Sequence, residues 1–138
     1  MTAKYMLDTD MCIYIAKRRP PQAQVRFTRV TVGEVVISVI THGELAFGAA
    51  KSKRAASDQA SLDRMLLETP IMPLGEETSA IYGAIRADLE SKGQTIGGND
   101  LWIGAHALSL GLILVTNNVR EFSRVSGLKI ENWLREAL

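Results

Sequence analysis

Four polar side chains stand at junctions between apolar segments, and they are Asp8, Glu44, Asp100 and Asn118. Asp8 directly follows Tyr5-Met6-Leu7, a short apolar run that is typical of a buried strand. A carboxylate at the mouth of a buried strand is energetically costly unless hydrogen bonds or a metal ion compensate its charge. Asp8 is therefore the first candidate for chemistry, and the question is whether the other three reach the same place.

The other three candidates also adjoin predicted strands or helices. Glu44 lies early in a helix predicted after strand 35–37, Asp100 opens a helix predicted at 101–110, and Asn118 follows strand 112–115. In open α/β sheets, ligands bind outside the carboxyl ends of the strands. We therefore expect the four side chains to share one pocket. Oxygen ligands favour Mg²⁺ or Mn²⁺, and such a site suits metal-assisted hydrolysis of phosphodiesters.

Each candidate also has a purely structural interpretation. Asp8 could cap the next helix, and Thr41-His42-Gly43-Glu44 fits the capping-box pattern. Asp100 suits a helix N-terminus, and Asn118 is a common turn residue. The sequence leaves these interpretations open, and only the placement of all four favours a site.

Other polar residues are weaker candidates. Glu121 is close enough to Asn118 to act as an auxiliary acid, and Thr9 could offer its hydroxyl to a metal or to Asp8. The two histidines, His42 and His106, are far apart in the sequence. A structural role for both is favoured over a metal-binding or acid–base pair.

The elements that would position these residues follow from the hydrophobic pattern. Strands are predicted at residues 5–7, 35–37, 70–74, 112–115 and 128–130, and helices at 11–17, 22–30, 39–51, 60–68, 76–92, 101–110, 119–124 and 132–138. This alternation predicts an α/β fold with a mainly parallel sheet. Prolines beside strand 70–74 suit an edge position. One domain covering residues 1–138 is expected.

Bulk composition excludes several classes of protein. The 138 residues are 46% hydrophobic with a net charge of +1, and the single cysteine, Cys12, rules out a disulfide framework. No apolar run approaches the ~20 residues of a membrane span. Asp8 and Asp10 interrupt any signal-peptide pattern, so a cytoplasmic location is expected. The basic clusters at 17–19 and 51–54 are either solvated helix ends or RNA-facing surfaces.

With these residues in view, the chain resembles the PIN-domain ribonucleases, and among them the VapC toxins of bacterial toxin–antitoxin pairs. The resemblance extends from the first strand to Glu131-Asn132-Trp133 and depends on four segments in family order. These are Met6-Leu7-Asp8-Thr9-Asp10, Ser38-Val39-Ile40-Thr41-His42-Gly43-Glu44-Leu45 with Gly48 after it, Ile96-Gly97-Gly98-Asn99-Asp100-Leu101-Trp102-Ile103-Gly104-Ala105-His106-Ala107, and Leu114-Val115-Thr116-Asn117-Asn118-Val119-Arg120-Glu121-Phe122. It implies a PIN-like α/β/α sandwich with a mainly parallel central sheet.

The resemblance also implies an activity and partners. The family's pattern is a Mg²⁺- or Mn²⁺-dependent endoribonuclease that cleaves cellular RNA, often tRNA, and so arrests translation. Asp8 and Asp100 match its metal-binding aspartates, Glu44 matches its acid after the second strand, and Asn118 stands where many members carry a fourth aspartate. A homodimer, and a VapB-type antitoxin that covers the active site, are implied as well.

Two positions depart from the family's pattern. Position 10 is often asparagine in the family and is Asp10 here, which adds a charge and a potential ligand. Asn118 is neutral, so it could bind a metal or water through its carbonyl oxygen but could not act as a base. A fully occupied second metal site is therefore in doubt.

Two other functions remain open. The run Leu7-Asp8-Thr9-Asp10 matches the D-x-D signature of aspartyl-phosphate phosphatases of the haloacid dehalogenase type, with Asp8 as nucleophile and Asp10 as acid. Against that function, no strand-end lysine is placed to hold the phosphate, and Glu44 has no role. The third possibility is a non-catalytic module whose acids bind a cation or the basic arm of a partner.

Overall fold

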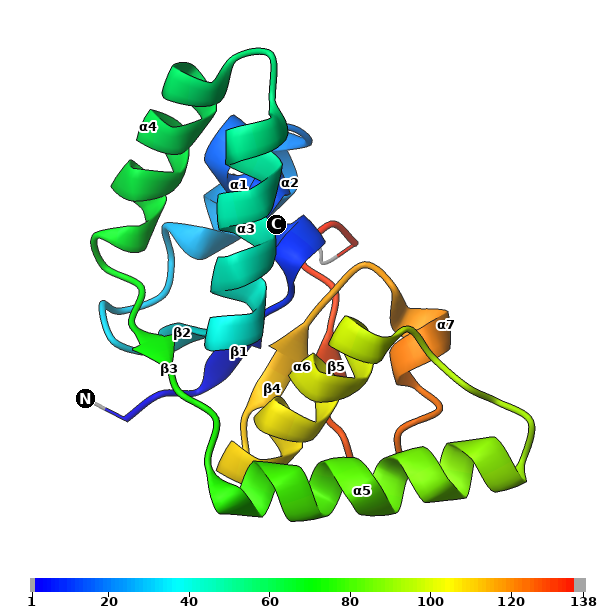
Figure 1. Ribbon diagram of the computed structural model, residues 1–138. Helices are drawn as coiled ribbons and strands as arrows, with labels where there is room; N and C mark the ends of the chain where they lie inside the picture. The colour runs from blue at the N-terminus through cyan, green and yellow to red at the C-terminus, as the bar shows by residue number, and fades with distance from the viewer. Residues whose placement is uncertain (1, 136–138) are drawn as a thin grey trace.

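A parallel five-stranded sheet forms the centre of the molecule, in the strand order β3-β2-β1-β4-β5 (Figure 1). The computed structural model describes residues 2–135. The strands are β1 (Tyr5–Leu7), β2 (Val35–Ser38), β3 (Ile71–Met72), β4 (Ile113–Val115) and β5 (Ile130–Glu131). The helices are α1 (Thr9–Lys17), α2 (Pro21–Phe27), α3 (Val39–Lys51), α4 (Ala55–Leu66), α5 (Glu76–Ser91), α6 (Gly98–Leu110) and α7 (Val119–Phe122).

Strand β1 lies in the middle of the sheet, and its register fixes the position of the polar residues that follow each strand. Leu7 at the end of β1 is level with Ile37 of β2 and with Val115 of β4. The residues just beyond these three positions therefore emerge at the same edge of the sheet. This confirms the predicted parallel arrangement, and β3 is an edge strand as its prolines indicated.

Alternation along the strands divides the buried side chains between two faces of the sheet. Leu7 and Ile37 pack with Met11 of α1 on one face, whereas Met6 and Leu114 pack with Ile103 of α6 on the other. Figure 1 shows α1 to α4 grouped together, with α5 and α6 lying apart from them. The structure is thus the predicted α/β/α sandwich. Among the described residues, no helix is both long and apolar enough to cross a membrane.

Several predicted boundaries were wrong. Helix α4 begins at Ala55, not at residue 60, and α6 begins at Gly98, not at residue 101. Strand β5 covers Ile130–Glu131 instead of residues 128–130. Of the helix predicted at 132–138, residues 133–135 form turns, and residues 136–138 lie outside the described part of the chain.

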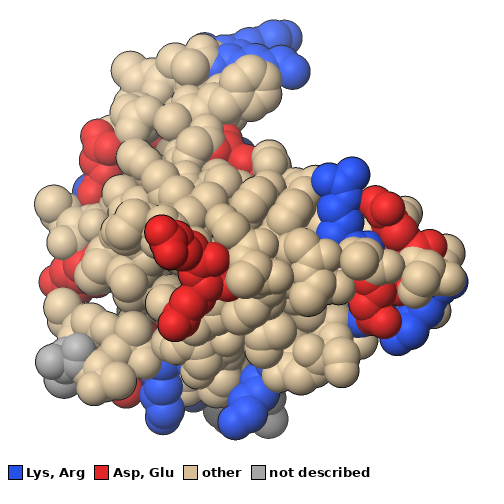
Figure 2. Space-filling model, turned by 60° about the horizontal axis from the view of Figure 1, so that its bottom comes forward, with Lys and Arg blue, Asp and Glu red and all other residues tan. Residues whose placement is uncertain are grey.

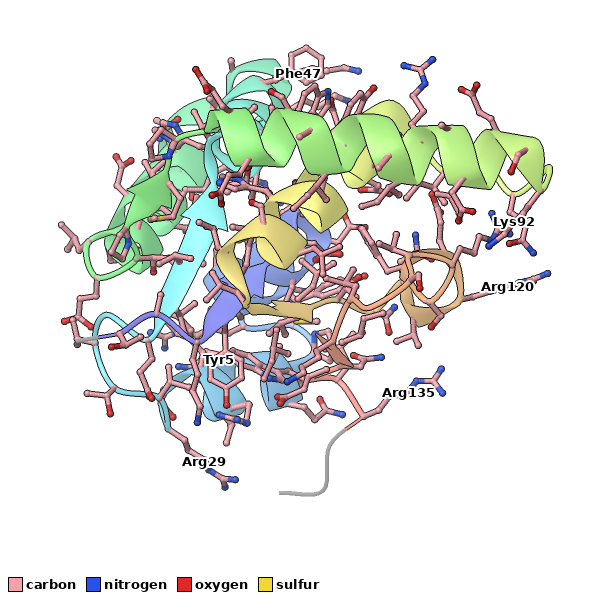
Figure 3. All side chains as sticks on the ribbon, turned by 90° about the horizontal axis from the view of Figure 1, so that it is seen from below. Tyr5, Arg29, Phe47, Lys92, Arg120 and Arg135 are labelled. Carbon is pink, nitrogen blue, oxygen red and sulfur yellow. The ribbon has the colours of Figure 1, made fainter. Side chains whose placement is uncertain are left out.

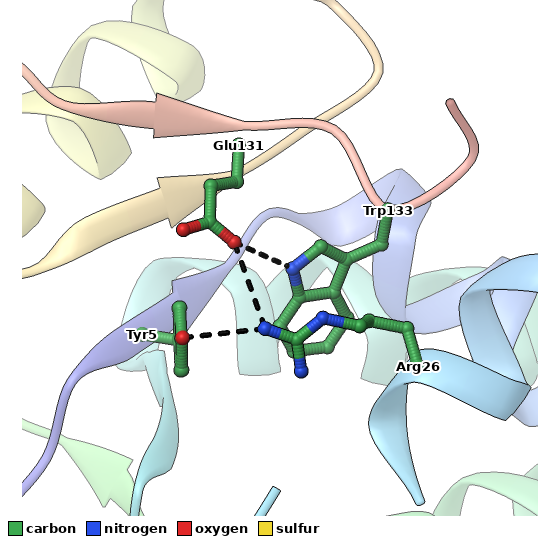
Figure 4. Close-up of polar contacts among 4 residues, drawn as sticks. All are labelled: Tyr5, Arg26, Glu131 and Trp133. Atoms are coloured by element: carbon green, nitrogen blue, oxygen red, sulfur yellow. Dashed lines mark hydrogen bonds and ion pairs between the residues drawn. The ribbon is translucent and has the colours of Figure 1, made fainter. Parts of the chain in front are cut away.

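An aromatic and ionic cluster fixes the chain after β5 (Figure 4). The Arg26 guanidinium lies 4.8 Å from the centroid of the Trp133 ring and 5.5 Å from that of the Tyr5 ring, within cation–π range of both. Glu131 accepts a hydrogen bond from the Trp133 indole at 3.1 Å and lies 3.9 Å from Arg26. These contacts join helix α2 to strand β1 and to the chain at the end of β5.

Helix α5 is less completely buried than its sequence pattern predicted. Its apolar positions recur every three or four residues, but Leu89 alone among Ala80, Ile81, Ala84, Ile85 and Leu89 is fully buried. Ile81 and Ile85 are half-buried, and the two alanines are exposed. The pattern located the helix correctly, yet one side of its apolar stripe faces outward.

Candidate active site

Asp8 is buried at the carboxyl end of β1 and is held by two hydrogen bonds. Its carboxylate accepts one from the backbone N–H of Met11 at 2.9 Å and one from the Thr116 hydroxyl at 2.5 Å. Only 5% of its surface is exposed. Asp8 is thus the N-cap of α1, as its structural interpretation proposed, and it also occupies the edge where the candidate residues meet.

Thr116 connects Asp8 to the loop after β4. While its hydroxyl donates to Asp8, the same oxygen accepts a hydrogen bond from the backbone N–H of Asn118 at 2.9 Å. Asn132, in the segment that the Arg26 cluster holds, donates to the side chain of the neighbouring Asn117 at 3.0 Å. The loop that carries Asn118 is therefore fixed from both sides.

Glu44 is tethered to two other helices. It accepts a hydrogen bond from the Thr9 hydroxyl of α1 at 2.5 Å and one from the side-chain amide of Asn99 of α6 at 3.1 Å. The N-cap of α3 is Ser38, whose hydroxyl accepts from the N–H of Ile40, so the capping-box interpretation of Glu44 was wrong. The Thr9 hydroxyl donates to Glu44, whereas the donors to the Asp8 carboxylate are Met11 and Thr116.

Glu121 joins the start of α6 to the loop after β4. One carboxylate oxygen accepts from the backbone N–H of Gly97 at 3.0 Å, and the other accepts from the Asn118 side-chain amide at 2.8 Å. Asp100 lies in the first turn of α6, next to this connection. Glu121 therefore belongs to the cluster, as a residue that positions Gly97 and Asn118.

Burial and the charges of neighbouring acids raise the pKa of two carboxyl groups in the cluster, those of Asp8 and Asp100. Burial raises the pKa of Asp8 to about 7, against the opposing hydrogen bonds from Thr116 and Met11, and the charges of Asp10 and Asp100 raise it further. Burial also raises the pKa of Asp100 to about 6, with additional contributions from Glu121, Glu44 and Asp10. These contributions indicate that the acids lie near one another, as the sequence predicted for Asp8, Glu44 and Asp100.

The donor atoms of the cluster suit a hard cation. Within residues 2–135, no group of three or more His, Cys, Asp or Glu side chains is arranged to hold a metal ion on its own. Mg²⁺ does not require such a cage, because it keeps several waters and binds through one or two carboxylates. Two carboxyl groups with raised pKa values, surrounded by oxygen donors, therefore fit Mg²⁺ or Mn²⁺.

The histidines do not form a pair at this site. His106 is fully buried in α6, and its Nδ1 lies 2.8 Å from the Ser38 hydroxyl, the group that caps α3. Burial lowers the pKa of His106. His106 thus connects the helix of Asp100 to that of Glu44, while His42 is half-buried in α3.

Known proteins resemble this chain along nearly its full length. The PIN domain family model matches residues 5–128. Ribonuclease VapC2 of Haemophilus influenzae (strain ATCC 51907 / DSM 11121 / KW20 / Rd) is 44% identical over 131 residues, which cover 95% of this chain and 98% of that protein. The tRNA(fMet)-specific endonuclease VapC of Shigella flexneri is 38% identical over 130 residues, covering 94% of this chain and 98% of that protein.

Solved structures agree with the sequence comparisons. The crystal structure of DNA-bound VapBC from Salmonella typhimurium has a chain that matches with a TM-score of 0.88 at 37% identity, covering 95% of this chain and 98% of that one. VapBC2 from Rickettsia felis, bound to a DNA fragment from its promoter, gives a TM-score of 0.85 at 36% identity, covering 96% and 99%. The chain therefore belongs to the PIN-domain family and, within it, to the VapC ribonucleases of toxin–antitoxin systems.

Proposed function

We propose that this chain is a Mg²⁺- or Mn²⁺-dependent endoribonuclease that cleaves cellular RNA, in the first place tRNA, and so inhibits translation. The observation that carries the proposal is the convergence of Asp8 and Asp100, both with raised pKa values, at the carboxyl edge of the sheet. Carboxyl groups that share a site repel one another when ionised, so the cluster favours a bound cation. The tRNA target is proposed from the likeness to a relative named as a tRNA(fMet)-specific endonuclease.

Each acidic residue has a separate role in this proposal. Asp8 and Asp100 hold the ion, which when bound supplies an activated water and neutralises charge on the phosphate. Glu44, fixed by Thr9 and Asn99, orders a water in the site. The side-chain amide nitrogen of Asn118 donates to Glu121. The side-chain carbonyl oxygen of Asn118 is therefore the atom that contacts the ion or a water.

An RNA digestion assay with and without EDTA tests the function directly. The chain is expected to cut a tRNA mixture in the presence of Mg²⁺ and to leave it intact when EDTA removes the ion. Digestion that continues in EDTA would refute metal dependence. No digestion under either condition would favour the non-catalytic binding module instead.

A VapB-type antitoxin is the proposed partner, and a groove beside Glu44 is its proposed binding site. The solved structures similar to this chain include VapBC complexes. The groove lies between α1, α3 and α4, and its lining includes Ile13, Glu44, Leu45, Gly48, Ala49 and Leu62. An amphipathic partner helix that binds there would reach Glu44 and cover the site.

Replacing Gly48 with leucine is expected to weaken antitoxin binding while RNA cleavage by the free chain persists. A Cβ added at this helical position meets no atom within 4 Å, so the free chain has room there for a side chain that extends into the groove. Steric overpacking costs about 1–3 kcal/mol, or roughly fivefold to 150-fold in affinity. The measurement is inhibition of cleavage by increasing amounts of the cognate antitoxin.

Ala60→Leu is the matched control for this variant. Ala60 is exposed on α4 and is not part of the groove lining, so antitoxin should inhibit this variant as it inhibits the wild type. If antitoxin inhibited Gly48→Leu as strongly as it inhibits the wild type, the groove would not be the antitoxin-binding site.

A homodimer is also proposed, and outward-facing apolar residues on α3 and α5 support it. Phe47 of α3 is 66% exposed and stands out from the ribbon in Figure 3, and Val39 on the same helix is 39% exposed. Ala80 and Ala84 of α5 are exposed as well. Such residues are the kind that a second copy of the chain would cover.

A further inference from the structure

A cavity of about 260 Å³ lies on the side of residues 95–98 that faces α5. It is lined by Tyr82, Arg86, Leu89, Glu90, Thr95, Ile96, Gly98 and Leu101. Pockets that bind drug-sized ligands measure about 300–1,000 Å³, so this smaller cavity has room for one planar ring system and not for a length of polymer. Within residues 2–135, the side chains of Tyr82 and Arg86 bond to each other, Arg86 also bonds to Glu90, and neither takes part in the hydrogen bonds of the acidic cluster.

The segment that lines this cavity also carries the start of the active site. Gly98 and Leu101 line the cavity, and Asp100 lies between them in the first turn of α6. On the side toward α7, Glu121 binds the N–H of Gly97, and Arg124 donates to the Thr95 carbonyl at 3.0 Å. Because one helical turn rises only about 5.4 Å, a group in the cavity lies within a nucleotide's reach of Asp100.

Tyr82 forms an aromatic wall of the cavity, and two contacts hold its ring in place. The Tyr82 ring stacks on Trp102 with centroids 3.7 Å apart and an angle of 9° between the planes. Its hydroxyl accepts a hydrogen bond from Arg86 at 3.0 Å. A fixed ring of this kind provides a surface on which a base can stack at little entropic cost.

The charges of the cavity favour a neutral ligand over a phosphate. Arg86 donates to Glu90 at 2.9 Å, so the positive and negative groups of the lining are paired. Lys92 and Asp88 form a second such pair at 3.1 Å. Figure 2 shows acidic and basic side chains close together at the right of the view. A phosphate would meet the Glu90 carboxylate, whereas the edge of a base can use both donors and acceptors.

We propose that this cavity binds one unpaired nucleobase of the RNA substrate, next to the phosphodiester that is cut at the acidic cluster. The inference rests on the proposed ribonuclease function and adds to it a site for a single base. Tyr82 supplies the stacking surface, and Arg86 with Glu90 contacts the edge of the base. Cleavage would then require a single-stranded nucleotide beside the scissile bond.

A binding experiment with abasic RNA tests the proposal separately from cleavage. The Asp100→Asn chain in EDTA serves as the parent, and the probe is a short fluorescein-labelled single-stranded RNA. A set of probes carries one abasic ribose at each position in turn, and fluorescence anisotropy gives the affinities. Adding Tyr82→Leu to the parent should weaken binding about tenfold, within the range that base–aromatic stacking provides.

The decisive result is non-additivity. One abasic position should weaken binding to the parent by about the same factor as Tyr82→Leu, and the same abasic probe should bind the Tyr82→Leu chain no more weakly than the intact probe. Tyr82→Phe keeps the ring and should behave like the parent. Arg86 is exposed, so Arg86→Gln should fold. This variant should also bind the intact probe more weakly, with the loss confined to the same abasic position, and it tests the proposal if Tyr82→Leu does not fold.

Three results would overturn the proposal. Additive losses at every position would show that Tyr82 does not contact a base, and unchanged affinity in both the Tyr82 and Arg86 variants would leave the cavity without a role. In each case a parent that still binds RNA would leave the ribonuclease function standing. A parent that binds no RNA would overturn the RNA substrate together with the base site.

Discussion

Replacing Asp100 with asparagine is expected to abolish RNA cleavage and to leave the fold intact. Asparagine has nearly the same size and lies in the same first turn of α6, but it removes the charge that the ion requires. Loss of a group that merely supports a metal ligand costs about 10- to 100-fold in affinity or activity, so loss of a ligand itself should exceed about 100-fold. The measurement is the single-turnover rate of tRNA cleavage in Mg²⁺.

Asp63→Asn provides the control for the chemical change alone. Asp63 is exposed on α4, away from the acidic cluster, so this variant should cleave RNA at the wild-type rate. Matching far-UV circular dichroism spectra of the three proteins would show that the fold is unaffected. Wild-type cleavage by Asp100→Asn would refute the assignment of Asp100 as a ligand.

Asp10→Asn separates the ribonuclease from the phosphatase function. Asp10 is exposed in the first turn of α1, and its charge raises the pKa of both Asp8 and Asp100. A ribonuclease in which Asp8 and Asp100 hold the ion should keep much of its activity without Asp10. An aspartyl-phosphate phosphatase would lose its general acid and become inactive.

The general placement of the site could be predicted from the sequence because it follows from strand order. In a parallel sheet, residues that follow apolar strands emerge at one edge, and this rule predicted that Asp8, Glu44 and Asn118 lie close together. Asp100 follows no strand, and it was predicted from its place at the start of a buried helix. The same rule extends to Thr116, the first residue after β4, whose hydroxyl joins Asp8 to the Asn118 loop. The position of Thr116 directly after the strand predicted at residues 112–115 was the signal that could have identified it.

The contacts that tether these side chains could not be predicted in the same way. Thr9 and Glu44 are 35 residues apart, and Glu44 and Asn99 are 55 apart, so no local pattern relates them. The capping-box pattern at Thr41 was misleading because Ser38 caps α3, three residues earlier. Tertiary contacts overrode the local signal there. They also bury Trp133 among turns, where a terminal helix was predicted.

The second large effect concerns Asp8, whose ionisation should destabilise the metal-free protein. The pKa of Asp8 is about 7 in the folded chain and near 3.8 when the chain is unfolded. Between these values the unfolded state releases the proton first, so the free energy of unfolding falls as the pH rises from about 4 to about 7. At 1.36 kcal/mol per pKa unit, Asp8 contributes a loss of up to about 4 kcal/mol.

Asp8→Asn should remove this pH dependence. Asparagine retains an oxygen that accepts from the N–H of Met11, so α1 stays capped, but it carries no charge to bury. In EDTA at pH 8 the variant should therefore be more stable than the wild type, and at pH 4 the two should be equal. Urea unfolding at both pH values measures the difference, in which contributions from titrating groups that do not interact with Asp8, such as His106, cancel.

Added Mg²⁺ should reverse the order of the two proteins at high pH. The ion binds the folded wild type through Asp8 and Asp100, and binding to the folded state alone raises the free energy of unfolding. Asp8→Asn lacks one ligand and should gain little, whereas Asp63→Asn should respond as the wild type does. If Mg²⁺ stabilised Asp8→Asn as much as the wild type, the ion would not be held by Asp8. Equal stability of the wild type and Asp8→Asn in EDTA at both pH 4 and pH 8 would show that Asp8 is ionised at no cost to the fold.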